Sequence, residues 1–154
     1  MGYVDRNLVS GEAVEYRARL HWVIFVAPLA LALIGSAAIV ARLAGAFGGW
    51  ILVAGLLVLA VAAGLALARW AVWVTSEFAI TNRRVLIKVG IVSRHSVELL
   101  LTKVEGVGVD QALVGRLLGY GTIVVTGTGG TREAFERIAH PLRFRTEVQS
   151  RVPA

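Results

Sequence analysis

The sequence predicts an α+β membrane protein in which a hairpin of two transmembrane helices is inserted into a small, partly open antiparallel β-barrel capped by a C-terminal helix. Three observations support this fold class. Two long runs contain no charged residue, strand-like segments lie on either side of that pair of runs, and short strands separated by glycine-containing turns follow. The 154-residue chain is 56% hydrophobic and 17% charged, which is too apolar for an ordinary globular domain.

Residues 1–21 are predicted to be an N-terminal juxtamembrane segment that contributes one strand to the β-domain. Apolar and charged side chains alternate along "AVEYRARL", residues 13–20, and a two-residue period is typical of a half-buried strand. The segment "VTSEFAI", residues 74–80, repeats this pattern directly after the second apolar run. One strand leads into the helical hairpin and the other leads out, so we expect them to pair antiparallel in one sheet.

The two apolar runs are long enough to cross a bilayer. Transmembrane helices are predicted at residues 22–41 and 50–70, joined by a short extracytoplasmic loop at residues 42–49. A hydrocarbon core about 30 Å thick needs roughly 20 apolar residues in a helix. The alternatives are a buried helical hairpin in a soluble core and a cleaved signal peptide. Neither run has a polar face, and the second run follows the first directly, so two spans are the better interpretation.

Tryptophan and basic residues flank the predicted spans. The expected interfacial anchors are Trp22, Trp50, Trp70 and Trp73. Basic residues are concentrated before the first span and after the second, whereas the loop between them contains only Arg42. The positive-inside rule therefore predicts a multi-pass protein of the cell membrane with both termini in the cytoplasm. The small residues Gly55, Ala62, Ala63, Gly64 and Ala66 indicate close packing of the two helices.

Residues 74–154 are predicted to form the soluble β-rich domain. Residues 84–89 and 91–101 should form a tight hairpin around Gly90, and residues 103–109 a strand that is bulged at its glycines. A short helix is expected after Asp110, which could act as its N-cap, and before Gly119, which should end it.

The C-terminal part of this domain is predicted to be one more hairpin and a helix. The segments "TIVVTG" and "REAFERIA" fit a hairpin, although Phe135 and Ile138 also allow a helix. A helix that begins at Pro141 would place Phe144 and Val148 on one side. Several strands followed by this helix are typical of a small, partly open β-barrel.

Three segments resemble the bacterial pleckstrin-homology-like (PH-like) membrane proteins, in which two transmembrane helices are followed by a PH-like domain. They are "LVSGEAVEYRARLHW", "FAITNRRVLIKVGIVSRHSVEL" and "KVEGVGVDQALVGRLLGYGTIVVTGTGG", and the most specific pieces are "ITNRRV" and "GRLLGYGTI". The resemblance implies a strongly bent antiparallel sheet of about seven strands with a helix capping one open end. It also implies protein–protein association or homo-oligomers, but not a particular activity, because a fold does not determine function.

No catalytic, cofactor-binding or metal-binding residues are predicted. The three histidines, His21, His95 and His140, have no ligand spacing, and the serines lie in no nucleophile motif. The glycine-rich residues 127–130 are interpreted as a hairpin turn, because no Lys-Ser/Thr pair follows as in a phosphate-binding loop. There is also no cysteine, which excludes disulfides and suits a cytoplasmic domain. The chain is therefore expected not to be an enzyme.

The basic residues carry the remaining functional signal. Residues 75–154 contain eleven basic and seven acidic residues, and Arg83, Arg84 and Lys88 lie just after the predicted membrane exit. These three are the candidate lipid-facing residues, since basic groups beside a membrane attract anionic lipids. Positive-inside topology alone also explains them. A nucleic-acid partner is not expected, because the positive charge is diffuse and lacks interleaved aromatic residues.

Two functions follow from these observations. The first is a non-catalytic, membrane-anchored PH-like scaffold that binds another membrane protein or its own copies. An accessory subunit of a larger membrane complex is a special case of this function. The alternative is a module whose basic hairpin binds the headgroups of anionic membrane lipids. Neither function requires a cofactor.

Overall fold

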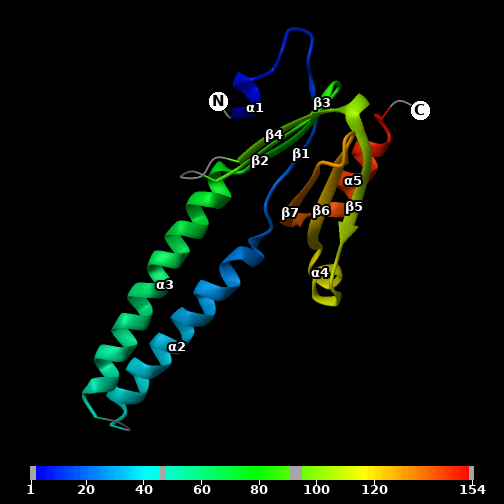
Figure 1. The fold of residues 1–154 in the computed structure, drawn as a ribbon. Helices are drawn as coiled ribbons and strands as arrows, with labels where there is room; N and C mark the ends of the chain where they lie inside the picture. Colours follow the sequence, from blue (N-terminus) through cyan, green and yellow to red (C-terminus); the bar gives the residue numbers. More distant parts are fainter. Residues whose placement is uncertain (1–2, 46–47, 91–94, 153–154) are drawn as a thin grey trace. The chain divides into compact units, whose positions relative to one another are not determined.

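The computed structural model describes residues 3–45, 48–90 and 95–152. The chain forms two compact units (Figure 1). The first unit combines Met1–His21 with Thr75–Ala154, and the second is the apolar segment Trp22–Val74. The chain therefore leaves the first unit after its first strand and returns to it at the second.

The apolar unit consists of the short 3-10 helix η1 (Trp22–Phe25) and the helices α2 (Val26–Leu43) and α3 (Trp50–Thr75). Both helical segments are long and apolar enough to cross a membrane. Helix α3 continues beyond residue 70 because no Gly or Pro interrupts the apolar sequence there. The prediction that Val74 starts a strand is therefore wrong, and only Ser76 separates α3 from the next strand.

Helices α2 and α3 approach each other closely at one glycine pair. A Cβ atom added to Gly35 would lie 3.0 Å from the Gly55 carbonyl oxygen, and one added to Gly55 would lie 3.0 Å from the Gly35 carbonyl oxygen. Gly55 and Ala62 are buried, which confirms the predicted close packing at these two positions, whereas Ala63 and Gly64 are exposed and do not contribute to it. Larger side chains such as Leu57 and Leu67 are more than 60% exposed, so the pair turns apolar surface outward.

The first unit contains two antiparallel sheets. The strands of the first sheet, in spatial order, are β1 (Val14–Ala18), β2 (Glu77–Thr81), β3 (Arg84–Val89) and β4 (His95–Leu100). Those of the second are β5 (Val104–Asp110), β6 (Tyr120–Gly127) and β7 (Arg132–Ala139). Strand β1 pairs antiparallel with β2, with Ala18 opposite Phe78, which confirms the predicted pairing across the helical hairpin.

The two sheets meet along one side only. An isolated bridge joins Leu20 to Ile138, the Ala139 N–H donates to the Arg19 carbonyl at 3.0 Å, and the His21 N–H donates to the Arg137 carbonyl at 2.7 Å. On the other side, β4 leads into β5 through the 3-10 turn η2 (Leu101–Lys103), and the described strands β4 and β5 do not pair. The described strands thus form two sheets joined along one side, and they do not close into a barrel.

The core lies between the sheets under the C-terminal helix α5 (Pro141–Gln149). Phe144 and Val148 of α5 are fully buried, as the spacing of apolar residues predicts. A second, small cluster lies on the other face of the first sheet, where Val4 of helix α1 (Tyr3–Arg6) packs against Ala79 and Leu86. Strand β2 is therefore covered on both faces, and this N-terminal cover was not predicted.

Several local predictions can be compared with the structure. The bulge in β5, the β6–β7 hairpin and the left-handed Gly119 (φ 79°) are confirmed. Asp110 is not an N-cap, because its backbone pairs with Thr122 in the sheet and helix α4 (Leu113–Leu118) begins after Ala112. The β3–β4 hairpin is confirmed by its pairing, whereas residues 91–94, where its turn was expected, lie outside the described residues.

Candidate functional site

Arg84, one of the three predicted lipid-facing residues, is engaged by carboxylates within the chain. Its Nε and Nη2 atoms donate to the two oxygens of Glu12, both at 2.9 Å. Nη1 donates to Glu98 at 2.6 Å, and Nη2 also donates to the Asn7 carbonyl at 2.7 Å. Only 16% of the Arg84 side chain is exposed and none of the Glu12 side chain is. This arrangement holds residues 7–12 against the first sheet.

Two further residues of the "ITNRRV" segment, Thr81 and Asn82, also bind the segment that contains Glu12. The Thr81 hydroxyl donates to Glu12 at 2.7 Å and accepts from the backbone N–H groups of Arg83 and Arg84. The Asn82 side chain bridges the backbone, because its Oδ1 accepts from the Ala13 N–H and its Nδ2 donates to the Gly11 carbonyl. We call Glu12, Thr81, Asn82 and Arg84 the N-terminal latch.

The latch is held by charge as well as by hydrogen bonds. The hydrogen bonds from Arg84 lower the pKa of Glu12 from 4.5 to about 2, although burial alone would raise it. Glu12 in turn raises the pKa of Arg84. Both groups are ionised at neutral pH, and each is compensated by the other. A buried charge compensated in this way is costly to separate from its partner.

The other two predicted basic residues have different surroundings. Lys88 lies over the Tyr3 ring, with its Nζ 5.0 Å from the ring centre. Arg83 is exposed in the turn after β2, and its guanidinium lies beside Gly11. The structure therefore does not group Arg83, Arg84 and Lys88 into one unoccupied basic surface. Lipid contact remains a prediction for all three residues.

The four predicted anchors lie at the ends of the apolar helices. Trp22 begins η1, Trp50 begins α3, and Trp70 and Trp73 lie in its last turns. The Trp22, Trp50 and Trp70 side chains are more than half exposed. Trp73 packs edge-on against Phe25, with ring centres 6.2 Å apart. These positions are compatible with the predicted interfacial role, which stays a prediction.

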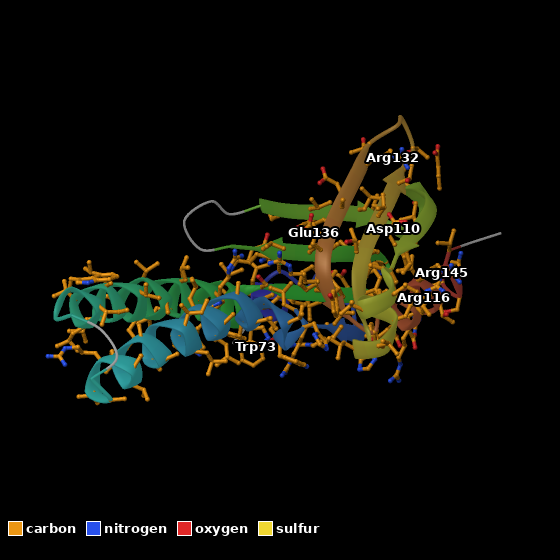
Figure 2. The ribbon with its side chains drawn as sticks, turned by 90° about the horizontal axis from the view of Figure 1, so that it is seen from below. Trp73, Asp110, Arg116, Arg132, Glu136 and Arg145 are labelled. Carbon is orange, nitrogen blue, oxygen red and sulfur yellow. The ribbon has the colours of Figure 1, made fainter. Side chains whose placement is uncertain are left out.

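A second basic group occupies the end of the β-unit where α4 and α5 begin. A cavity of about 680 Å³ lies between the end of β5, α4 and the first turn of α5, and its lining includes Arg116, Arg143 and Arg145. Figure 2 shows Arg116 and Arg145 at this end of the unit, away from Arg132. The described residues provide no carboxylate within ion-pair distance of these three arginines. The Nε atom of Arg145 is buried without a hydrogen-bond partner.

Helix α4 beside this cavity exposes apolar side chains. Leu113, Val114, Leu117 and Leu118 are 79%, 56%, 87% and 42% exposed. The helix is nevertheless firmly positioned, because a Cβ added to Gly115 would lie 2.6 Å from the Tyr120 carbonyl oxygen. α4 therefore presents four large apolar side chains outward from a rigid support. We refer to α4 together with the cavity and its three arginines as the α4–α5 surface.

Comparison with protein families supports the same fold. The description "Bacterial PH domain" applies to a family that matches residues 22–152. The chain belongs to the bacterial PH domain family. This match spans both apolar helices and the β-unit after them, which confirms the resemblance found in the sequence. PH-like domains are generally non-catalytic binding modules, and family membership indicates this type of activity here.

The other comparisons add no relative. No curated protein and no solved structure matches the chain. Among the described residues, no three His, Asp or Glu side chains are grouped so that they could hold a metal ion. Among the described residues, the α4–α5 surface and the unpaired strand edge of β4 are two features that could contact a partner.

The role of Glu12 and the grouping of the three arginines were not predicted from the sequence. Glu12 is a single acidic residue in a loop, and it meets Arg84 across 72 residues. Arg116 lies in α4, while Arg143 and Arg145 lie in α5. No local pattern links positions so far apart. In the sequence, the one indication of this site was a charged residue, Arg116, within an otherwise apolar helical segment.

Proposed function

We propose that this bacterial PH domain protein is a non-catalytic, membrane-anchored scaffold. In this proposal α2 and α3 cross the cell membrane and both termini lie in the cytoplasm. The β-unit then associates with another membrane protein, or with its own copies, at the cytoplasmic membrane face. The unpaired edge of β4 is the observation that carries the proposal.

Membrane anchoring is supported by the surface of the apolar unit. Most large side chains on α2 and α3 are turned outward, and leucines such as Leu33 and Leu57 are over 60% exposed. Water would not favour such a surface, since each fully exposed leucine forfeits about 1.5–3 kcal/mol of burial. A hydrocarbon environment removes this cost, and the helices have the length to span it.

The β4 edge offers backbone groups to a partner strand. The Leu101 N–H donates to the Arg83 carbonyl at 2.9 Å, and the β3–β4 register continues from this pair. Neighbouring residues in a strand direct their backbone groups to opposite edges, so Ser96, Glu98 and Leu100 present theirs away from β3. An unpaired edge of this kind accepts a strand from another chain.

Leu100 allows a test of the edge that leaves the fold intact. Its φ of −61° matches the value that proline requires, and its N–H does not serve the β3–β4 ladder. The variant Leu100→Pro should therefore keep the stability of the domain within about 1 kcal/mol. It should also remove the last N–H donor of the outward edge and disperse the assembly, measured as the mass of the detergent-solubilised full chain with its partners.

The matched control is Leu100→Ala, which removes the half-exposed side chain but keeps the N–H. It should retain the assembly. An assembly that survives Leu100→Pro, or a wild-type chain that is monomeric and without partner in mild detergent, would contradict the scaffold proposal. Release of the full chain from the membrane fraction by alkaline carbonate would separately contradict membrane anchoring.

Binding of anionic lipid headgroups is the second candidate function. At the β2–β3 hairpin it would depend on Arg83, Arg84 and Lys88, and this basis is weakened because Arg84 is paired with Glu12 and Glu98. A different part of the molecule has the chemistry that this function needs.

A further inference from the structure

We infer that the α4–α5 surface is a second membrane-contact site, in which α4 lies in the lipid interface and the arginine-lined cavity binds an anionic lipid headgroup. The inference rests on the proposed membrane anchoring and adds to it a surface that no predicted site residue includes. Its occupant is the bilayer that α2 and α3 would span.

The apolar character of α4 is the first argument. Leu113 and Leu117 are 79% and 87% exposed, so the helix contributes almost nothing to the core of its own unit. Four exposed large apolar side chains in a six-residue helix form a contiguous patch, and such a patch marks a contact surface. Gln111 fixes the helix to the sheet by donating to the Tyr120 carbonyl at 2.9 Å. The patch is thus presented in a fixed orientation.

The connectivity of the chain is the second argument. His21 is the last residue of the β-unit before the apolar segment, and its imidazole is hydrogen-bonded to the backbone of Leu118 in α4. The His21 ring also packs on the Tyr120 ring, with centres 5.3 Å apart. The next residue, Trp22, begins the apolar segment. The covalent chain therefore keeps α4 beside the point where the proposed membrane span starts.

The charge of the surface is the third argument. Arg116, Arg143 and Arg145 line one cavity, and the described residues leave them without carboxylate partners. Helix α5 begins at the same cavity without an acidic residue in its first turn and without a side-chain cap. Its N-terminal N–H groups add positive potential. Phosphate oxygens suit arginine donors in this arrangement.

These three properties together favour a bilayer over a protein partner. An apolar helix rimmed by arginine is typical of a segment that lies in a membrane interface. A protein partner could use the same arginines, but only the bilayer accounts for the connection of α4 through His21 to the start of the proposed span.

The test uses the full chain in nanodiscs, and it measures membrane depth with a spin label. The natural sequence contains no cysteine, so a single Cys at any position carries the only label. Leu117→Cys reports on α4, Thr128→Cys in the exposed β6–β7 turn is the aqueous control, and Leu57→Cys on the exposed face of α3 tests the membrane span. Collision with oxygen and with a water-soluble nickel chelate gives the depth.

We expect the label at position 117 to be several-fold less accessible to the nickel chelate than the label at 128, in nanodiscs of phosphatidylcholine with one quarter phosphatidylglycerol. If the label at 117 is as accessible to the nickel chelate as the label at 128, while the label at 57 lies in lipid, the inference is overturned and membrane anchoring is not. An aqueous label at 57 overturns both. If spin–spin broadening of the label at 117 grows with the number of chains per disc, α4 contacts a second copy of the chain, and the inference that it contacts the bilayer is overturned.

The arginines are tested by lipid composition. In nanodiscs of phosphatidylcholine alone, the label at 117 should be shallower than with phosphatidylglycerol present. The variant Arg116→Ser should abolish this difference, whereas Arg132→Ser, which removes the same charge from exposed β7, should preserve it. Headgroup binding at this cavity is overturned if the depth of the label in the parent protein does not depend on phosphatidylglycerol. It is also overturned if this dependence survives Arg116→Ser, or if both variants lose it. Free inorganic phosphate added to phosphatidylcholine discs should not restore the depth; if it does, a soluble anion is the ligand instead.

Discussion

Two groups of arginines in the β-unit have opposite environments. Arg84 donates four hydrogen bonds, three of them to carboxylates, and its side chain is mostly buried. Arg116, Arg143 and Arg145 line a cavity and have no carboxylate partner among the described residues. The first group lies in the segment that the sequence singled out, and the second does not. The comparison shows that the density of basic residues does not distinguish an arginine that stabilises the fold from one that has no carboxylate partner.

The largest expected effect is on stability. Arg84→Ala leaves the buried Glu12 carboxylate uncompensated and should lower the free energy of unfolding of the β-unit by about 3–5 kcal/mol. Arg116→Ala should change it by less than about 0.5 kcal/mol, because the residue has no partner to lose. All four tryptophans lie in the apolar unit, so amide hydrogen exchange of residues 77–89 is the suitable measurement. Equal losses in the two variants would remove the distinction between the groups.

The pH dependence sharpens the same comparison. The pKa of Glu12 is 4.5 in the unfolded chain and about 2 in the folded one, so its contribution is complete above pH 4.5 and is lost as the pH falls toward 2. The shift corresponds to at most about 3 kcal/mol. The protection of the amides of residues 9–13, relative to the intrinsic exchange rate at each pH, should fall over this range in the parent protein. In Glu12→Gln this acid-dependent step should be missing, and a parent protein whose latch is unchanged at pH 2.5 would contradict the assignment.

A smaller effect is expected at the end of the β-unit where Arg116, Arg143 and Arg145 have no carboxylate partner among the described residues. Among the described residues, Arg116 forms no ion pair that could hold α4 in place. The close contact between Gly115 and the Tyr120 carbonyl helps to hold it instead. Gly115→Ala should destabilise α4 by about 2 kcal/mol, because the backbone has to move away from the new methyl group. Gly106→Ala, where an added Cβ meets nothing within 4 Å, is the control and should be near neutral. Unchanged exchange in residues 113–121 of Gly115→Ala would show that this contact does not hold the helix.

Much of the fold could be predicted from local patterns. The two-residue period of β1, the length of the apolar runs and the glycine at the end of α4 depend on residues close in sequence. The pairing of β1 with β2 followed from connectivity, because a helical hairpin returns the chain to its starting point. A prediction was wrong where a residue type suits either of two neighbouring secondary-structure elements. Asp110 is a good N-cap by type, but the sheet already uses its backbone.

The candidate sites depended on contacts between distant residues. The sequence by itself determined that Arg84 and Arg116 are both basic and that α4 has an apolar face. Only the tertiary structure decided that Glu12 neutralises Arg84 from 72 positions away, while α4 turns Leu117 away from the core. It also decided that residues 3–6 cover the first sheet. The physical reason is that side-chain type limits what a residue can bind, whereas burial and pairing depend on which segments the fold brings together.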